Sequence, residues 1–147
     1  MSLIDDQIEI QTLAQTYAHG VMSRDAEVWA STWAEDSVWY LGTPEPVSGR
    51  DNIVKLWKGA MGAYPVVLHM VQPGIIDVDG ATATARWYIH ESIVTADGDQ
   101  IYNVGVYNDT LKKIDGAWKF SSRKFNSMYR GPADLSGNLD GYKTYST

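Results

Sequence analysis

Four segments in the second half of the chain have the residue pattern of β-strands, and only very short turns separate them. They cover residues 66–78, 81–94, 100–114 and 117–130. Asp-Gly dipeptides at 79–80 and 115–116, and the sequence ADGD at 96–99, stand between the segments and are typical of tight turns. Because strands joined by tight turns run in opposite directions, this half of the chain predicts an antiparallel meander. Pro73-Gly74 interrupts the first segment and indicates a bulge or bend there.

The residues before position 65 carry apolar side chains at the spacing of α-helices instead. Helices are predicted over residues 3–22, after a capping Asp25, and over residues 50–63, with a short strand over 36–41. The inward faces of the second and third helices are expected to carry Val28, Trp29, Thr32 and Trp33, and Ile53, Leu56, Trp57, Ala60 and Met61. Helices followed by strands indicate an α+β domain, in which three N-terminal helices pack on a curved, mostly antiparallel sheet. Such a sheet forms a cone whose apolar interior can bind a small molecule.

Charge and composition exclude several classes of protein. Lys and Arg number 12 and Asp and Glu number 18, which gives a net charge of −6 without a basic patch, so no nucleic-acid partner is expected. No apolar stretch approaches the roughly 18 residues of a membrane span, and no signal peptide is seen. We therefore expect a cytoplasmic protein that does not enter a membrane. A single domain is expected over residues 1–147, with a core at about 4–130 and a Gly-, Ser- and Asp-rich tail at 131–147.

His69 is the first candidate for chemistry, because imidazole is the side chain most easily tuned to accept a proton near neutral pH. It stands in the apolar segment VVLHMV. The alternative interpretation is a core histidine that is satisfied by one hydrogen bond. His19, His69 and His90 do not have the spacing of metal ligands, and neither a phosphate-binding loop nor a nucleophile elbow is present. We therefore expect neither a metal nor a cofactor.

Strand alternation assigns the other candidates to the two faces of the sheet. It places Trp87 and Glu91 on the inner face of 81–94 and His90 on the outer face. Glu91 is close to the end of its strand, which favours a carboxylate on the rim over an acid inside the pocket. Alternation also places Arg123 on the polar, outer face of the last strand.

Two tyrosines can contribute polar groups to an interior pocket. Tyr17 faces the sheet from the first helix, where its hydroxyl could polarise a substrate oxygen or hydrogen-bond to the backbone. Tyr107 shares a face with Gly105, and the missing side chain at Gly105 leaves room for a cavity or a strand bend.

The order of these elements over residues 4–130 resembles the SnoaL-like, or nuclear-transport-factor-like, superfamily of α+β cone folds. The resemblance depends on the segments YAHGVMSRD, WAEDSVW, SGRDNIVKLW, LHMV, DVDGATATARWY and GVYNDTLKKIDGAWKFSSR. Within the superfamily the chain is similar to the scytalone dehydratase branch, which includes the hexachlorocyclohexane dehydrochlorinase. The segments MSRDAEVWASTWAED and KKIDGAWKF carry this closer similarity.

The resemblance implies an enzyme that eliminates water or HCl from a small cyclic substrate without a cofactor. In that branch the base is a strand histidine, matched by His69, and an Asp at the end of the first helix orients it. Arg123 matches an active-site Arg, which requires a bulge in the last strand, and Tyr17 stands where the dehydrochlorinase has a Lys. The Asp position falls on Met22, which cannot accept a strong hydrogen bond. Another acid, Glu91 or Asp109, would then serve, or the base is weaker, or the pocket binds without catalysing.

We expect a pocket between the first helix and the sheet. Its expected lining is Tyr17, Met22, Trp39 or Tyr40, Trp57, His69, Trp87, Tyr107 and Arg123, with Glu91 at its edge. The first hypothesis is a lyase or isomerase in which His69 removes a proton while Tyr17 or Arg123 stabilises negative charge or the departing group. The second is a small-molecule-binding protein without catalysis. The third is a structural role like that of the small subunit of ring-hydroxylating oxygenases, which has the same fold.

Self-association is also expected. The branch commonly forms trimers, and dimers occur elsewhere in the superfamily. In this chain Tyr88, His90 and the tail with its tyrosines stand on expected outer surfaces, where they could form contacts between subunits.

Overall fold

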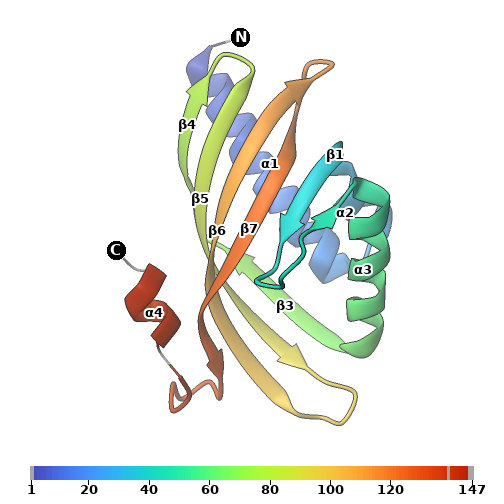
Figure 1. Ribbon diagram of the computed structural model, residues 1–147, viewed down its shortest axis with the longest axis vertical. Helices are drawn as coiled ribbons and strands as arrows, with labels where there is room; N and C mark the ends of the chain where they lie inside the picture. The colour runs from blue at the N-terminus through green and yellow to red at the C-terminus, as the bar shows by residue number, and fades with distance from the viewer. Residues whose placement is uncertain (1, 139, 146–147) are drawn as a thin grey trace.

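One curved sheet extends through the molecule, and three helices lie along one of its sides (Figure 1). The computed structural model describes residues 2–138 and 140–145, so residues 1, 139, 146 and 147 of the expected domain lie outside the description. The helices are α1 (Leu3–Ser23), α2 (Ala26–Ser31), α3 (Arg50–Ala63) and α4 (Asp140–Tyr145). The strands are β1 (Trp33–Tyr40), β2 (Val47–Ser48), β3 (Val66–Val71), β4 (Ile75–Asp79), β5 (Thr82–Val94), β6 (Gln100–Ile114) and β7 (Ala117–Gly131).

The sheet has the order β2-β1-β7-β6-β5-β3, and β4 pairs with the other end of β5. Within the described residues only β1 and β7 run parallel, so the predicted antiparallel meander and the α+β class are confirmed. The expected break at Pro73-Gly74 divides the first segment into β3 and β4. As a result β3 pairs with residues 89–94 of β5, and β4 pairs with residues 82–86.

Local capping interactions define both ends of α1. Ser2 and Asp5 form a reciprocal capping box, in which the Asp5 N–H donates to Ser2 Oγ at 3.2 Å. Arg24 ends the helix in the left-handed conformation with φ of 56°. Asp25 then caps α2 as predicted, because its Oδ1 accepts from the N–H groups of Glu27 and Val28 at 3.1 Å. Only Arg24 and Asp25 therefore separate the end of α1 from the start of α2.

Two polar contacts hold α1 across the inner face of the sheet. Gln11 exchanges hydrogen bonds with both backbone groups of Gly74, at 3.2 and 3.3 Å. Nearer the N-terminus, Asp6 Oδ1 accepts from Lys113 Nζ and Trp118 Nε1, both at 2.9 Å. Beside and beyond these contacts the apolar stripe of α1 is buried against the core. The buried residues of this stripe are Ile10, Ala14, Tyr17, Ala18 and Val21.

The second expected helix is shorter than predicted, and the strand after it begins earlier. Trp33 is the first residue of β1 and pairs with Phe120 of β7, so it does not belong to a helix face. The Thr32 carbonyl accepts from the Phe120 N–H at 2.9 Å, so hydrogen bonding to β7 begins at this residue. In α3 the buried stripe is Ile53, Trp57 and Met61, whereas Leu56 is 44% exposed, contrary to the prediction.

Strand β7 contains two bulges. Thr110 pairs with Ser122 and Leu111 with Phe120, which leaves Ser121 as an extra residue. Further along, Val104 pairs with Tyr129 and Gly105 with Ser127, which leaves Met128 as a second extra residue. Because one extra residue moves every later side chain to the other face, each bulge reverses the alternation of β7.

Among the described residues, no helix is both long enough and apolar enough to cross a membrane.

Candidate active site

A cavity of about 190 Å³ lies between α1, α3 and the inner face of the sheet. Most of its wall is apolar or aromatic, and a few polar side chains gather on the strands. The apolar part consists of Val21, Trp39, Leu41, Trp57, Ala60, Met61, Val67, Ile93 and Phe125. The part with polar groups consists of Tyr17, Tyr64, His69, Glu91, Tyr107 and Arg130. An apolar cavity with a few convergent polar groups is the usual form of a small-molecule site.

His69 and Glu91 form a close pair inside this cavity. They stand directly opposite each other on β3 and β5, and Nδ1 of His69 lies 2.6 Å from Oε1 of Glu91. The imidazole is 2% exposed and the carboxylate side chain 18% exposed. With Nδ1–H donating to the carboxylate, Nε2 is the basic nitrogen, and no group in the described part of the chain hydrogen-bonds to it. This is the arrangement of a general base held in one tautomer.

Glu91 is itself held by neighbouring strands. Asn103 Nδ2 donates to Oε2 of Glu91 at 3.4 Å, and Ser127 Oγ donates to Asn103 Oδ1 at 3.1 Å. Burial raises the pKa of the Glu91 carboxyl, but the hydrogen bond and charge of His69, with Asn103 and Arg130, bring it below its ordinary value of 4.5. The side chain is therefore ionised at neutral pH.

A pair of buried phenols lies beside the imidazole. The Tyr17 and Tyr107 hydroxyl oxygens are 3.3 Å apart, and the two ring centroids lie 5.7 and 6.5 Å from that of His69. Burial raises the pKa of both hydroxyls above their ordinary value of 10.0. Both therefore stay protonated at neutral pH. One hydroxyl donates to the other, so the accepting phenol keeps an O–H that can donate a hydrogen bond into the cavity.

Arg123 lies behind the two phenols. The first bulge of β7 turns it inward, where it is 1% exposed, so the outward placement expected from alternation is wrong. Its Nε donates to Asp109 Oδ1 at 2.9 Å, and its Cζ lies 3.8 Å from the Tyr107 ring centre and 4.3 Å from that of Tyr17. Burial raises the pKa of the Asp109 carboxyl to about 6, although the Arg123 charge opposes this. Arg123 thus packs against the rings of Tyr17 and Tyr107 from behind and is not part of the cavity lining.

The structure brings six of the expected site residues to the cavity wall. These are Tyr17, Trp39, Trp57, His69, Glu91 and Tyr107. Glu91 was expected on the rim, yet it contacts His69 directly, because both residues face inward at the same level of paired strands. Tyr64, Asn103 and Arg130 complete the surroundings of the site and were not anticipated from the sequence. Simple alternation from the inward-facing Trp118 also places Arg130 on the inner face, because the two bulges of β7 cancel each other at this position.

Three other expected lining residues lie elsewhere. Met22 is 42% exposed, because Val21 takes the inward position in the last turn of α1. Tyr40 alternates with Trp39 along β1 and therefore points to the outer face of the sheet. Trp87 is fully buried in the core, where its ring covers Gly74. An added Cβ at Gly74 would lie 2.3 Å from that ring, so the indole fills the space over the β3–β4 break.

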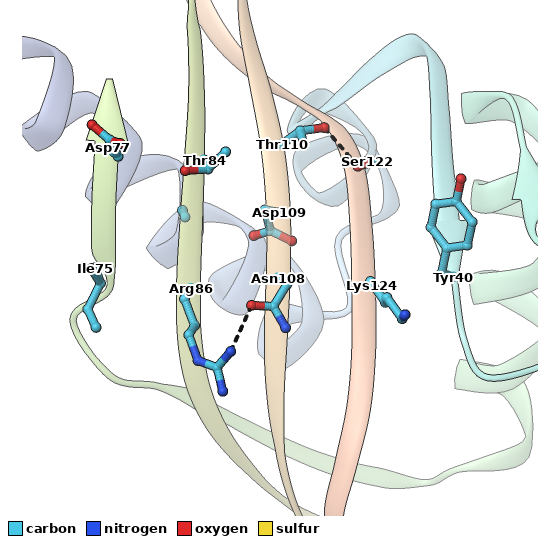
Figure 2. Close-up of a pocket in the computed structure, with 11 residues that line it drawn as sticks. Tyr40, Ile75, Asp77, Thr84, Arg86, Asn108, Asp109, Thr110, Ser122 and Lys124 are labelled. Carbon is cyan, nitrogen blue, oxygen red and sulfur yellow. Dashed lines mark hydrogen bonds between the residues drawn. The ribbon is translucent and has the colours of Figure 1, made fainter. Parts of the chain in front are cut away.

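A larger hollow of about 630 Å³ lies on the outer face of the sheet (Figure 2). Most of its lining side chains are polar, and Figure 2 shows Arg86 hydrogen-bonded to Asn108 and Thr110 hydrogen-bonded to Ser122 across neighbouring strands. None of its described lining residues is a histidine, and two pairs of its polar groups hydrogen-bond to each other. We therefore assign the acid–base chemistry to the smaller, inner cavity.

The inner cavity offers few ligands for a metal ion. His69 and Glu91 are the two side chains of that kind in its wall, and they bond to each other. Within residues 2–138 and 140–145, no three His, Cys, Asp or Glu side chains converge on one point. The arrangement is suited to proton transfer by side chains.

The fold and the cavity define a small α+β protein of the cone-fold class. A family model described as SnoaL-like domain matches residues 2–124, and the chain belongs to this family. The resemblance noted in the sequence is therefore confirmed.

Individual relatives are distant in sequence but close in structure. The uncharacterised protein Rv2910c of Mycobacterium tuberculosis is 27% identical over 123 residues, which is 82% of this chain and 84% of that protein. A candidate scytalone dehydratase of Novosphingobium aromaticivorans superposes with a TM-score of 0.82 at 20% identity and covers 91% of each chain. The hexachlorocyclohexane dehydrochlorinase LinA-type3 of Novosphingobium barchaimii LL02 gives 0.81 at 20% identity, over 92% of this chain and 93% of that chain. The two solved structures establish the shared fold.

Proposed function

We propose that this protein is a cofactor-independent lyase or isomerase that removes a proton from a small, ring-containing, largely apolar compound. The observation that carries the proposal is the 2.6 Å contact between His69 and Glu91 inside an apolar cavity. It supplies a carboxylate for the histidine, although the residue at the family's Asp position, Met22, is an exposed thioether. The acid comes from strand β5 in place of the first helix.

The reaction follows from the positions of the polar groups. His69 Nε2 accepts a proton from a carbon next to an electron-withdrawing group, and Glu91 stabilises the imidazolium that forms. Of the hydrogen-bonded pair Tyr17 and Tyr107, the hydroxyl that accepts from the other donates its own proton to the oxygen or leaving group on which negative charge develops. A general base of this kind contributes about 10²- to 10⁴-fold to the rate.

The size of the cavity limits the substrate. Apolar cavities of about 150 Å³ are large enough for benzene, and this cavity measures about 190 Å³. A single ring with one or two small substituents therefore fits. The structural likeness to a hexachlorocyclohexane dehydrochlorinase supports a ring compound as well.

Replacing His69 by glutamine tests the proposed base. The purified protein is incubated in D₂O with a panel of cyclic alcohols and ketones, and proton NMR follows deuterium uptake and elimination. We expect exchange or elimination with the natural chain and a loss of about 10²- to 10⁴-fold in H69Q, because the amide cannot accept the proton as imidazole does. The control is His90→Gln, since His90 belongs to the outer face and not to the cavity lining.

Unchanged turnover in H69Q would rule out the proposed base. A ligand that binds in the cavity and is always recovered intact and undeuterated would instead favour a binding protein without catalysis.

We also propose that the protein self-associates through the outer face of the sheet. Leu68 and Met70 of β3 and Tyr88 of β5 are 48%, 42% and 37% exposed there. These neighbouring apolar side chains would be removed from water in a trimer or dimer. Sedimentation equilibrium should show a multiple of the monomer mass that decreases in Leu68→Asp, whereas a monomeric natural chain at high micromolar concentration would contradict this proposal.

A further inference from the structure

The second bulge of β7 directs a cation into the cavity. Without the extra residue Met128, simple alternation from the inward-facing Ser127 would place Arg130 on the outer face. With the bulge, Arg130 pairs with Asn103 of β6 and shares its inward direction, and it contributes to the cavity wall. Bulges are frequent next to active sites, where they redirect a side chain.

Arg130 stands at one end of a row of polar residues. Along this row His69 pairs with Glu91, Glu91 with Asn103, and Asn103 with Arg130, on the adjacent strands β3, β5, β6 and β7. Three strand spacings put the backbone of Arg130 roughly 14 Å from that of His69. His69 is at the buried end of the row and Arg130 at the exposed end.

The two inward arginines differ in their partners. Arg123 is paired with Asp109 and covered by aromatic rings. Arg130, by contrast, pairs with no carboxylate among the described residues. The nearby Glu91 already uses one oxygen for His69 and the other for Asn103. The charge of Arg130 lowers the pKa of Glu91, but its guanidinium forms no hydrogen bond or ion pair with that side chain, so its N–H groups remain available to an anion that enters with the ligand.

We infer that the ligand of this cavity is a single-ring compound that carries a carboxylate, with the carboxylate at Arg130 and the ring against Trp39 and Trp57. The inference rests on the proposed function, because it names the class of substrate for the same cavity. A planar guanidinium matches a carboxylate through two parallel hydrogen bonds, and the indole walls suit the ring. Fixing the acidic end at the mouth would turn the ring carbons toward His69 Nε2.

The test compares benzoate with its neutral analogue benzamide. Binding to the full chain is followed at pH 7.5 and low salt by the fluorescence of the tryptophans that line the cavity, and by calorimetry. We expect benzoate to bind about tenfold more tightly than benzamide, and this preference to weaken as salt is raised. In Arg130→Gln the preference should disappear. Lys124→Gln removes a charge from the same strand, outside this cavity, and should leave the preference unchanged.

Three results would overturn the inference: equal affinity for the two probes, no benzoate binding at millimolar concentration, or a preference that persists in Arg130→Gln. Binding is measured without turnover, so the inference and the proposed function can fail separately. Deuterium exchange of neutral ketones without any benzoate preference would remove the inference and keep the function. A benzoate preference without deuterium exchange in any compound would keep the inference about the ligand and remove the proposed catalytic function.

Discussion

Replacing Glu91 by glutamine is expected to slow proton transfer by roughly 10⁴-fold. A serine protease loses about this much turnover when the carboxylate that pairs with its histidine becomes an amide. Glutamine keeps the size of the side chain but removes the negative charge that stabilises the imidazolium of His69. Its NH₂ group can also face Nδ1, which favours the tautomer with the proton on Nε2. Deuterium exchange in the responsive compound measures the rate. Nitrogen NMR of the His69 ring should show Nδ1 protonated and Nε2 unprotonated in the natural chain, and a changed tautomer balance in E91Q.

The matched control is Glu35→Gln, an exposed glutamate of β1 outside the cavity lining. It should leave both the rate and the His69 ring shifts unchanged. A rate in E91Q within threefold of the natural chain, or a natural chain with its ring proton on Nε2, would show that Glu91 does not orient the base.

Replacing Arg123 by methionine is expected to destabilise the protein by about 3–5 kcal/mol at pH 8. The change leaves the Asp109 carboxylate buried without its partner, and Oδ2 of Asp109 already has no hydrogen bond. It also removes the guanidinium from its contacts with Tyr17, Tyr107 and Phe120. Urea denaturation of the natural chain and of R123M gives the difference in the free energy of unfolding. Lys124→Met, at the next and exposed position, should change it by no more than about 0.5 kcal/mol.

The effect of R123M should depend on pH with a definite sign. Burial raises the pKa of Asp109 from 3.8 to about 6, so between these values the native state binds a proton that the unfolded chain has lost. The contribution of Asp109 to stability therefore decreases as pH rises through this window. Without Arg123 the pKa rises further, and the window extends above pH 6. The destabilisation should be larger at pH 8 than at pH 5, and equal losses at the two values would mean that the charge of Asp109 plays no part.

Much of the fold could be predicted because its signals are local. The capping residue Asp25, the Asp-Gly turns and the break at Pro73-Gly74 all act within a few residues of the chain. Periodicity likewise identified the buried stripe of α1, since a helix of known period must bury its apolar face. The early start of β1 at Trp33 was missed, because its pairing with Phe120 joins residues far apart in the sequence.

The candidate site could be predicted only in part, and Arg123 shows why. Alternation placed Arg123 on the outer face, whereas the family resemblance required it on the inner face. One extra residue in β7 turns its side chain inward. Nothing in the run of small and polar residues before Arg123 specifies where the extra residue falls. The pairing of β7 with β6 determines the bulge, and this pairing is a property of the assembled sheet. At Arg130 the two bulges cancel, so its inward direction agrees with simple alternation from Trp118.

By itself, the amino-acid sequence determined the α+β class, the hairpins, the family and the presence of a histidine facing an apolar interior. These depend on short-range spacing, on turn chemistry and on motif order. The tertiary structure alone decided which acid accompanies His69. Met22 occupies the position where the family has its Asp, and Glu91 is 22 residues from His69 along the chain. Only the antiparallel register of β3 and β5 brings the carboxylate of Glu91 within 2.6 Å of the imidazole, because register joins residues that no local pattern relates.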